Sequence, residues 1–173
     1  MSVLTIYRNN GAIRFSADPL RGVVFVSFAR PISGKETAGG GKKYRWEEKV
    51  TIALSPQEAS IIGAFSRLTL AGQSPKKNPV ISHTPEKFGK KGLPKTLKVE
   101  KRDDSIFFSI AVKDETVTVG PIGFADLYMI DSFLSRFIPE ILPKPRVPVP
   151  PTPEAEIEET KEEVVKKEEE ILF

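Results

Sequence analysis

The sequence predicts one α+β domain in which two helices pack on antiparallel β-sheet. Short segments of alternating β-branched and aromatic residues recur between turn signals, and two longer segments carry apolar residues at helical spacing. A proline-rich run then precedes an acidic end. The 173 residues allow one ordinary domain with an appendage. We expect the domain over residues 1–142, a linker over 143–153 and an acidic tail over 154–173.

Four strands are expected before the first helix. Segments 3–7 and 12–17 flank Asn9-Asn10-Gly11, and the Asn-Gly step favours a tight hairpin turn. Residues 23–30 form the third expected strand. A glycine-rich loop follows, and the fourth strand is expected over 43–54. These strands follow one another closely, which predicts a meander.

The sequence predicts where the first helix begins. Ser55 is a preferred N-cap residue, Pro56 suits the first helical position, and Glu58 stands where a capping box requires an acid. Apolar residues at helical spacing extend this helix to about residue 71. We expect a long loop over 72–94, strands over 96–101, 106–113 and 116–119, and a second helix with a broad apolar stripe over 122–141.

Charge divides unevenly along the chain. The formal net charge is +3, but residues 1–153 hold 23 Lys+Arg against 14 Asp+Glu, whereas residues 154–173 hold 3 against 9. A basic body favours a polyanion such as nucleic acid, although an anionic membrane or an acidic protein would suit it as well. Charge alone does not choose among these partners.

The composition argues against catalysis. The chain has no cysteine and one histidine, His83, which removes thiol nucleophiles, disulfides and the common zinc sites. The acidic pairs Glu47-Glu48 and Asp103-Asp104 are adjacent in sequence, so their carboxylates point apart rather than toward one substrate atom. We expect no catalytic residues, no metal and no cofactor.

The sequence also gives expectations about membrane association, cellular compartment and thermal adaptation. Because the sequence contains neither a membrane-spanning apolar run nor a signal-peptide pattern, we expect no membrane association and a cytoplasmic protein, nucleoid-associated if the source is prokaryotic. Lysine and glutamate dominate while Met, Gln, Asn and His are scarce, a bias found in proteins from thermophiles.

A series of short motifs resembles the Whirly family. These are Tyr44-Arg45-Trp46, the run 49–55, His83-Thr84-Pro85, the run 95–99 and the run 107–110, in matching order across roughly residues 3–142. Thr84 replaces the family's aspartate, and residues 8–13 keep only the final small-apolar pair of the family's lysine-containing motif. The resemblance implies two four-stranded antiparallel sheets, a tetramer, and binding of single-stranded DNA between neighbouring sheets with little sequence preference. The family is similar to kinetoplastid guide-RNA-binding proteins and positive-cofactor-four coactivators, which extends the ligand to RNA.

The residues indicate the same kind of ligand by themselves. Sequence-tolerant binding of single strands needs aromatic faces on which bases stack and cations that follow the backbone. Phe25 and Phe107 could instead be core residues, and the lysines of the 76–95 region could be a solvated insertion. The candidate nucleic-acid-binding residues are Tyr7, Arg8, Arg14, Phe25, Lys43, Tyr44, Arg45, Trp46, Lys49, Lys87, Lys90, Lys91, Lys95, Lys98 and Phe107.

Two further expectations concern assembly. The wide apolar stripe of the second helix, together with the first helix, predicts a homo-oligomer, with a tetramer favoured by the resemblance. The tail, expected to be disordered or helical, ends in Ile171, Leu172 and Phe173 and resembles the tail of bacterial single-strand binding proteins, where this tip docks protein partners. A solvated charged tail is the plainer interpretation. The rival function is an RNA-binding or regulatory interaction module whose acidic tail recruits partner proteins.

Overall fold

The computed structural model describes residues 2–32, 44–85, 92–103 and 105–142. These residues form two antiparallel four-stranded sheets and two helices, so the expected α+β class and the expected pair of four-stranded antiparallel sheets are confirmed. None of the helices in these ranges is long and apolar enough to cross a membrane. The proposed linker and acidic tail lie outside the described residues.

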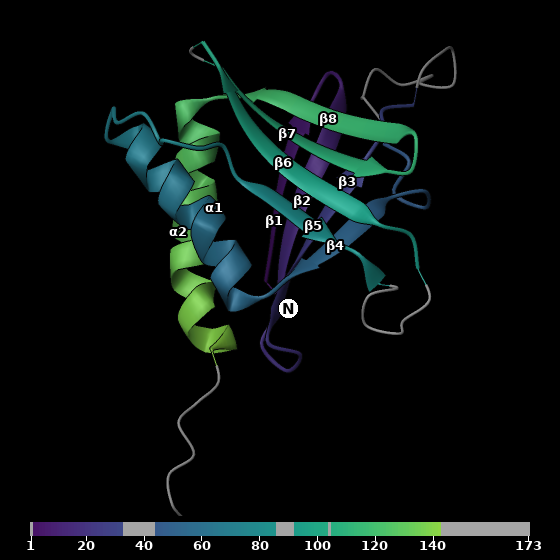
Figure 1. Cartoon of the computed structure of the whole chain (residues 1–173), viewed down its shortest axis with the longest axis horizontal. Helices are drawn as coiled ribbons and strands as arrows, with labels where there is room; N and C mark the ends of the chain where they lie inside the picture. Colours follow the sequence, from purple (N-terminus) through teal and green to yellow (C-terminus); the bar gives the residue numbers. More distant parts are fainter. Residues whose placement is uncertain (1, 33–43, 86–91, 104, 143–173) are drawn as a thin grey trace, which may run out of the picture. The chain divides into compact units, whose positions relative to one another are not determined.

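Each sheet is a meander, with strands side by side in chain order. The first sheet consists of β1 (Ser2–Arg8), β2 (Gly11–Asp18), β3 (Val23–Ala29) and β4 (Val50–Leu54). The second consists of β5 (Val80–His83), β6 (Lys95–Arg102), β7 (Ser105–Val112) and β8 (Glu115–Ile122). Figure 1 shows the second sheet lying across the first.

The core lies between the two sheets and under the helices. Side chains alternate along each strand, so one face of each sheet turns inward. Phe15 of β2 meets Phe108 of β7 edge to face, with 6.1 Å between ring centroids, and Phe133 of the second helix lies 6.4 Å from Phe15. Because the inner faces share one core, the outer faces of the sheets point to opposite sides of the sandwich.

Helix α1 (Pro56–Leu70) begins and ends at local signals. The Ser55 hydroxyl accepts from the Glu58 N–H at 3.3 Å, and the Glu58 carboxylate accepts from the Ser55 N–H at 2.9 Å, which completes the predicted capping box. At the other end Gly72 has φ of 72°, and the N–H of Gln73 donates to the carbonyl of Leu68. This is a Schellman ending, which requires a left-handed residue where glycine stands.

Helix α2 (Phe124–Ile141) packs beside α1, as Figure 1 shows. Its inward residues are fully or nearly buried, namely Leu127, Ile130, Leu134, Phe137 and Ile141. Arg67 of α1 joins the pair by an ion pair to Asp131 at 3.1 Å and a hydrogen bond to the Ser135 hydroxyl at 2.7 Å. Phe124 and Tyr128 remain 66% and 65% exposed, so the helix stripe is wider than this domain alone buries.

Three strand predictions were wrong in detail. The last strand, expected over 116–119, runs over Glu115–Ile122. The expected loop over 72–94 contains β5, whose alternation of Val80, Ile81, Ser82 and His83 is too short to stand out between prolines. The fourth strand begins at Val50 rather than residue 43, because residues 46–48 form a turn. That turn is closed by the Lys49 N–H donating to the carbonyl of Trp46.

Candidate functional site

The outer face of the first sheet carries most of the predicted aromatic and basic residues that the structure describes. Strand register places Thr5, Arg14, Ser27 and Thr51 in one row across all four strands. Tyr7 and Phe25 lie on the same face in the neighbouring rows, because side chains two residues apart share a face. We call Tyr7, Arg14, Phe25, Tyr44 and Trp46 the aromatic face.

Trp46 stacks on Arg14 near the middle of this face. The Arg14 guanidinium carbon lies 3.9 Å from the ring centroid of Trp46, and its Nε donates to the Thr5 hydroxyl at 3.2 Å. The 46–48 turn makes this possible, because it takes Trp46 out of the strand ladder and over the sheet. Arg14 therefore orients the indole by lying over its ring. The sequence had suggested only that Arg14 would contact a phosphate of the ligand.

Tyr7 and Tyr44 form a second ring pair on the aromatic face. Their centroids are 5.2 Å apart and the planes are tilted by 38°. The Tyr44 hydroxyl donates to the carbonyl of Arg8 at 3.0 Å, and Tyr7 is 50% exposed. Burial raises the pKa of the Tyr44 phenol. The nearby Tyr7 phenol raises this pKa further, and the positive charge of Arg8 partly offsets the increase. Tyr44 is thus a neutral, fixed ring at neutral pH, and Tyr7 offers an open one.

An open cavity of about 700 Å³ lies against these rings. Three of its lining residues were not predicted, and they are Asn9, Ile32 and Glu47. Asn9 belongs to the turn that the Asn-Gly signal identified, but nothing in a turn signal says what the turn faces. The remaining lining residues are Tyr7, Arg8, Tyr44 and Trp46.

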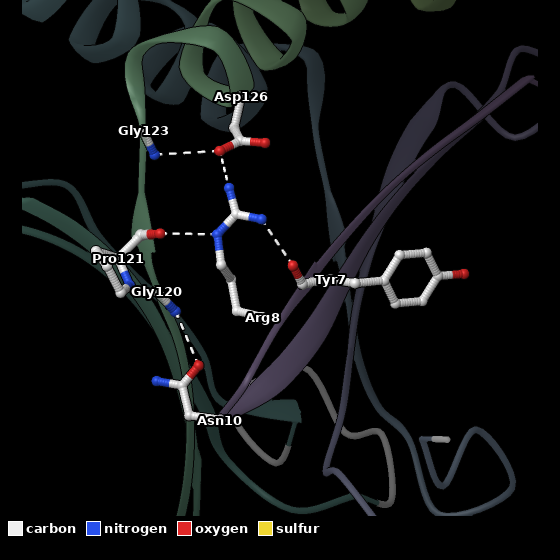
Figure 2. A network of polar contacts seen from close by, with 7 residues as sticks. All are labelled: Tyr7, Arg8, Asn10, Gly120, Pro121, Gly123 and Asp126. Carbon is white, nitrogen blue, oxygen red and sulfur yellow. Dashed lines mark hydrogen bonds and ion pairs between the residues drawn. The ribbon is translucent and has the colours of Figure 1, made fainter. Parts of the chain in front are cut away.

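Arg8 lies at the cavity but its guanidinium is held by protein groups. Its Nε donates to the carbonyl of Pro121 at 2.8 Å, its Nη1 donates to the carbonyl of Tyr7 at 2.7 Å, and its Nη2 pairs with the Asp126 carboxylate. Figure 2 shows the guanidinium enclosed by these three acceptors, with the Tyr7 ring pointing away from it. The sequence suggested Arg8 as a ligand cation, and the structure instead gives it partners on β1, β8 and α2.

Of the other candidates on this side, the two basic residues are exposed, whereas Phe25 of the aromatic face is not. Lys49 follows the turn and is exposed, and Arg45 pairs with Glu48 at 3.6 Å at the surface. Phe25 is half-buried, with the Arg21 guanidinium carbon 6.0 Å from its ring centroid. It is therefore an outer-face residue rather than a member of the core cluster.

The second sheet presents its own candidates on the opposite side. Lys98 is exposed on β6, and Phe107 on β7 lies against Gly120, where an added Cβ would come within 2.6 Å of the ring. The Arg102 guanidinium carbon lies 5.1 Å from the Phe107 ring centroid. Lys95 lies between the sheets, where its Nζ donates to the carbonyl of Thr51 at 2.7 Å. The predicted residues thus form two groups rather than one site.

Several predicted residues lie outside the described part of the chain. They are Lys43, Lys87, Lys90, Lys91, Ile171, Leu172 and Phe173. Within the described ranges, no group of three or more Asp, Glu or His side chains could hold a metal ion. The aromatic face instead joins open rings to nearby cations, which suits a ligand that alternates flat ring systems with negative charges.

Comparisons with known proteins agree with this architecture. The crystal structures of Trypanosoma brucei MRP1/MRP2 match with a TM-score of 0.50 at 10% identity, covering 82% of this chain and 94% of that one. A guide-RNA-binding protein complex bound to a gRNA matches with a TM-score of 0.45 at 14% identity, covering 78% and 87%. No curated protein matches the chain. The family model described as Whirly transcription factor matches residues 7–129, and the chain therefore belongs to the Whirly family.

Proposed function

We propose that this protein binds single-stranded nucleic acid, with DNA as the ligand and little sequence preference. The observation that carries the proposal is the aromatic face, where the Tyr7–Tyr44 pair and Trp46, which stacks on Arg14, border one open cavity. Stacking on such rings accepts any base, because every base has a π-face. Membership of the Whirly family supports the same class of ligand. Binding of this kind needs no catalytic group.

Exposed lysines would supply the contacts to the backbone. Lys49 is next to the aromatic face, and Lys98 lies on the outer face of the second sheet. Each lysine that neutralises a phosphate of a single strand adds about 0.7 to the slope of log affinity against log salt. Comparing Lys49→Ala with Lys98→Ala therefore tells which face the strand follows. We expect the shallower slope in Lys49→Ala.

The direct test is fluorescence anisotropy with oligo(dT), oligo(rU) and a duplex of equal length at two salt concentrations. We expect oligo(dT) to bind most tightly and the duplex to bind weakly, because paired bases cannot open onto the rings. Equal affinity for duplex and single strand would overturn the proposal. Tighter binding of oligo(rU) would instead favour the RNA-binding alternative.

We further propose that the domain assembles as a homo-oligomer, with a tetramer favoured. Ile61 and Leu68 of α1 are 50% and 40% exposed, and Phe124 and Tyr128 of α2 are exposed as well. Burying these side chains against another copy would remove apolar surface that a single domain leaves in water. Light scattering should show the oligomer for the native chain and smaller species for Phe124→Ser with Tyr128→Ser. A native monomer at micromolar concentration would contradict this.

The acidic tail is proposed to recruit protein partners through Ile171, Leu172 and Phe173. Deleting these three residues should leave oligonucleotide affinity unchanged while abolishing partner recruitment. We also propose a cytoplasmic location for this nucleic-acid-binding protein, with association to the nucleoid if the source is a prokaryote. Loss of oligonucleotide affinity after the deletion would show that the tip belongs to the binding domain instead.

A further inference from the structure

The end of β1 is tied to the second sheet and to α2 by side chains. Asp126 accepts from the Arg8 guanidinium and from the N–H of Gly123, so one carboxylate serves both the ion pair and the start of α2. Asn10 adds a second link, because its side-chain carbonyl accepts from the N–H of Gly120 at 3.2 Å. Figure 2 shows Arg8 reaching Pro121 of β8 and Asp126 of α2, and Asn10 reaching Gly120 of β8.

Arg8 also contacts the backbone that positions the Tyr7–Tyr44 pair. The carbonyl of Arg8 accepts from the Tyr44 hydroxyl, and the carbonyl of the adjacent Tyr7 accepts from the Arg8 guanidinium. Both contacts act on the backbone from which the Tyr7 ring projects. Loss of the guanidinium contacts would therefore loosen the backbone segment that carries the Tyr7 ring and accepts from the Tyr44 hydroxyl.

Burial and charge argue against a direct contact between Arg8 and a phosphate. The side chains of Arg8 and Asp126 are 29% and 15% exposed. If Arg8 turned to a phosphate, the partly buried Asp126 carboxylate would lose its cation and a negative charge would remain beside the ligand. Leaving one member of such a pair without its partner is costly.

We infer that Arg8 and Asp126 are a positioning pair for the proposed nucleic-acid site, holding the Tyr7–Tyr44 rings in place rather than binding the ligand. This inference rests on the proposed function. It assigns a role in binding to Asp126, an acid that electrostatics alone would place among residues opposing an anionic ligand.

The sign of one substitution tests the inference. If Arg8 bound phosphate, Asp126→Asn would free the guanidinium, remove a negative charge and tighten binding. A positioning pair predicts that Asp126→Asn and Arg8→Gln both weaken oligo(dT) binding about fivefold, a fraction of what one stacked base contributes. The salt slope should stay unchanged in Arg8→Gln, whereas loss of a phosphate contact would lower it by about 0.7.

The second helix provides a matched control. Asp131 is 16% exposed and pairs with Arg67 of α1, so Asp131→Asn makes the same change of charge on the same helix without touching the tyrosine pair. We expect Asp131→Asn to leave affinity unchanged or to tighten it slightly. Equal weakening in Asp126→Asn and Asp131→Asn would overturn the positioning role.

A mutant cycle with both tyrosines replaced, Tyr7→Leu with Tyr44→Leu, separates positioning from simple loss of stability. In this background Arg8→Gln should still lower the melting temperature but should no longer weaken binding, because both rings that it positions are absent. A full additional loss of affinity there would contradict the inference. If the native protein fails to bind oligo(dT) at all, the proposed function fails, which is a different result from an unaltered affinity in Arg8→Gln.

Discussion

Replacing Trp46 by alanine should weaken binding while leaving the domain folded. The ring lies on the outer face of the first sheet, half-buried, and is not part of the core cluster. Its contact with Arg14 at 3.9 Å is a cation–π interaction, which at an exposed site contributes about 0.5 to 1 kcal/mol. We therefore expect the free energy of unfolding to fall by about 1 kcal/mol, against about 3 to 5 kcal/mol for a core tryptophan.

The effect on binding should be larger than the effect on folding. A stacked base contributes about 1 to 3 kcal/mol to single-strand binding, and about 1.4 kcal/mol corresponds to tenfold in affinity. Oligo(dT) affinity in Trp46→Ala should therefore fall by at least about fivefold. Anisotropy at two salt concentrations measures the affinity, and circular dichroism in urea measures the stability. Because Trp46 is the one tryptophan of the chain, its emission in the native protein should also change on binding.

Trp46→Phe is the matched control. It keeps an aromatic ring over Arg14, so it should retain most of the affinity and nearly all of the stability. An unchanged affinity in Trp46→Ala would remove the ring from the ligand site. A stability loss near that of a core tryptophan, together with normal binding per folded molecule, would show that the aromatic face is structural.

Three other predictions follow from the described contacts and the charge distribution. Ser55→Ala removes the capping box of α1, and urea denaturation should show a loss of about 1 kcal/mol with oligonucleotide affinity unchanged; a neutral result would mean that the box does not stabilise the helix. Partial burial raises the pKa of the Glu58 carboxyl, but hydrogen bonds from Ser55 and His83 and the charge of His83 outweigh it and hold that pKa below its ordinary value of 4.5. The stability from Glu58 should therefore be fully present above about pH 4.5 and lost as the pH falls through the lower folded-state pKa, and Glu58→Gln should remove this acid dependence. Deleting residues 152–173 should tighten oligonucleotide binding severalfold at low salt and hardly at high salt, because mobile acidic charges compete by about 1 kcal/mol or less; weaker binding would contradict this.

Signals within a few residues were enough to predict the elements they begin and end. Ser55, Pro56 and Glu58 mark the start of α1 because capping involves groups three residues apart, and Gly72 marks its end for the same reason. The β1–β2 hairpin is equally local, but its turn residues are Asn9 and Asn10, and Gly11 is the first residue of β2 without a positive φ. Such features depend on neighbours in the chain, so a sequence displays them directly.

Contacts between distant segments could not be predicted in this way. Arg8 and Asp126 are 118 residues apart, and no spacing rule pairs an arginine at a strand end with an acid in a helix's first turn. Strand β5 was missed because four residues carry too little alternation, and its identity depends on pairing with β6. The turn at 46–48 was missed because the sequence of residues 43–54 suits a strand. The contact of Trp46 with Arg14 on β2, two strands away from β4, is not visible in that sequence.

The partners of the basic residues also change what the net charge implies for binding. Arg8 is held by Asp126, Arg14 by the Trp46 ring and Thr5, and Lys95 by the carbonyl of Thr51. These cations were counted as phosphate contacts when only the sequence was considered, yet each already has a protein partner. Within the described residues, the proposed site therefore depends more on rings than on charge. We expect the salt slope for oligo(dT) to correspond to only a few phosphates at about 0.7 each, and a slope matching the full basic count would show that these partners exchange for the ligand.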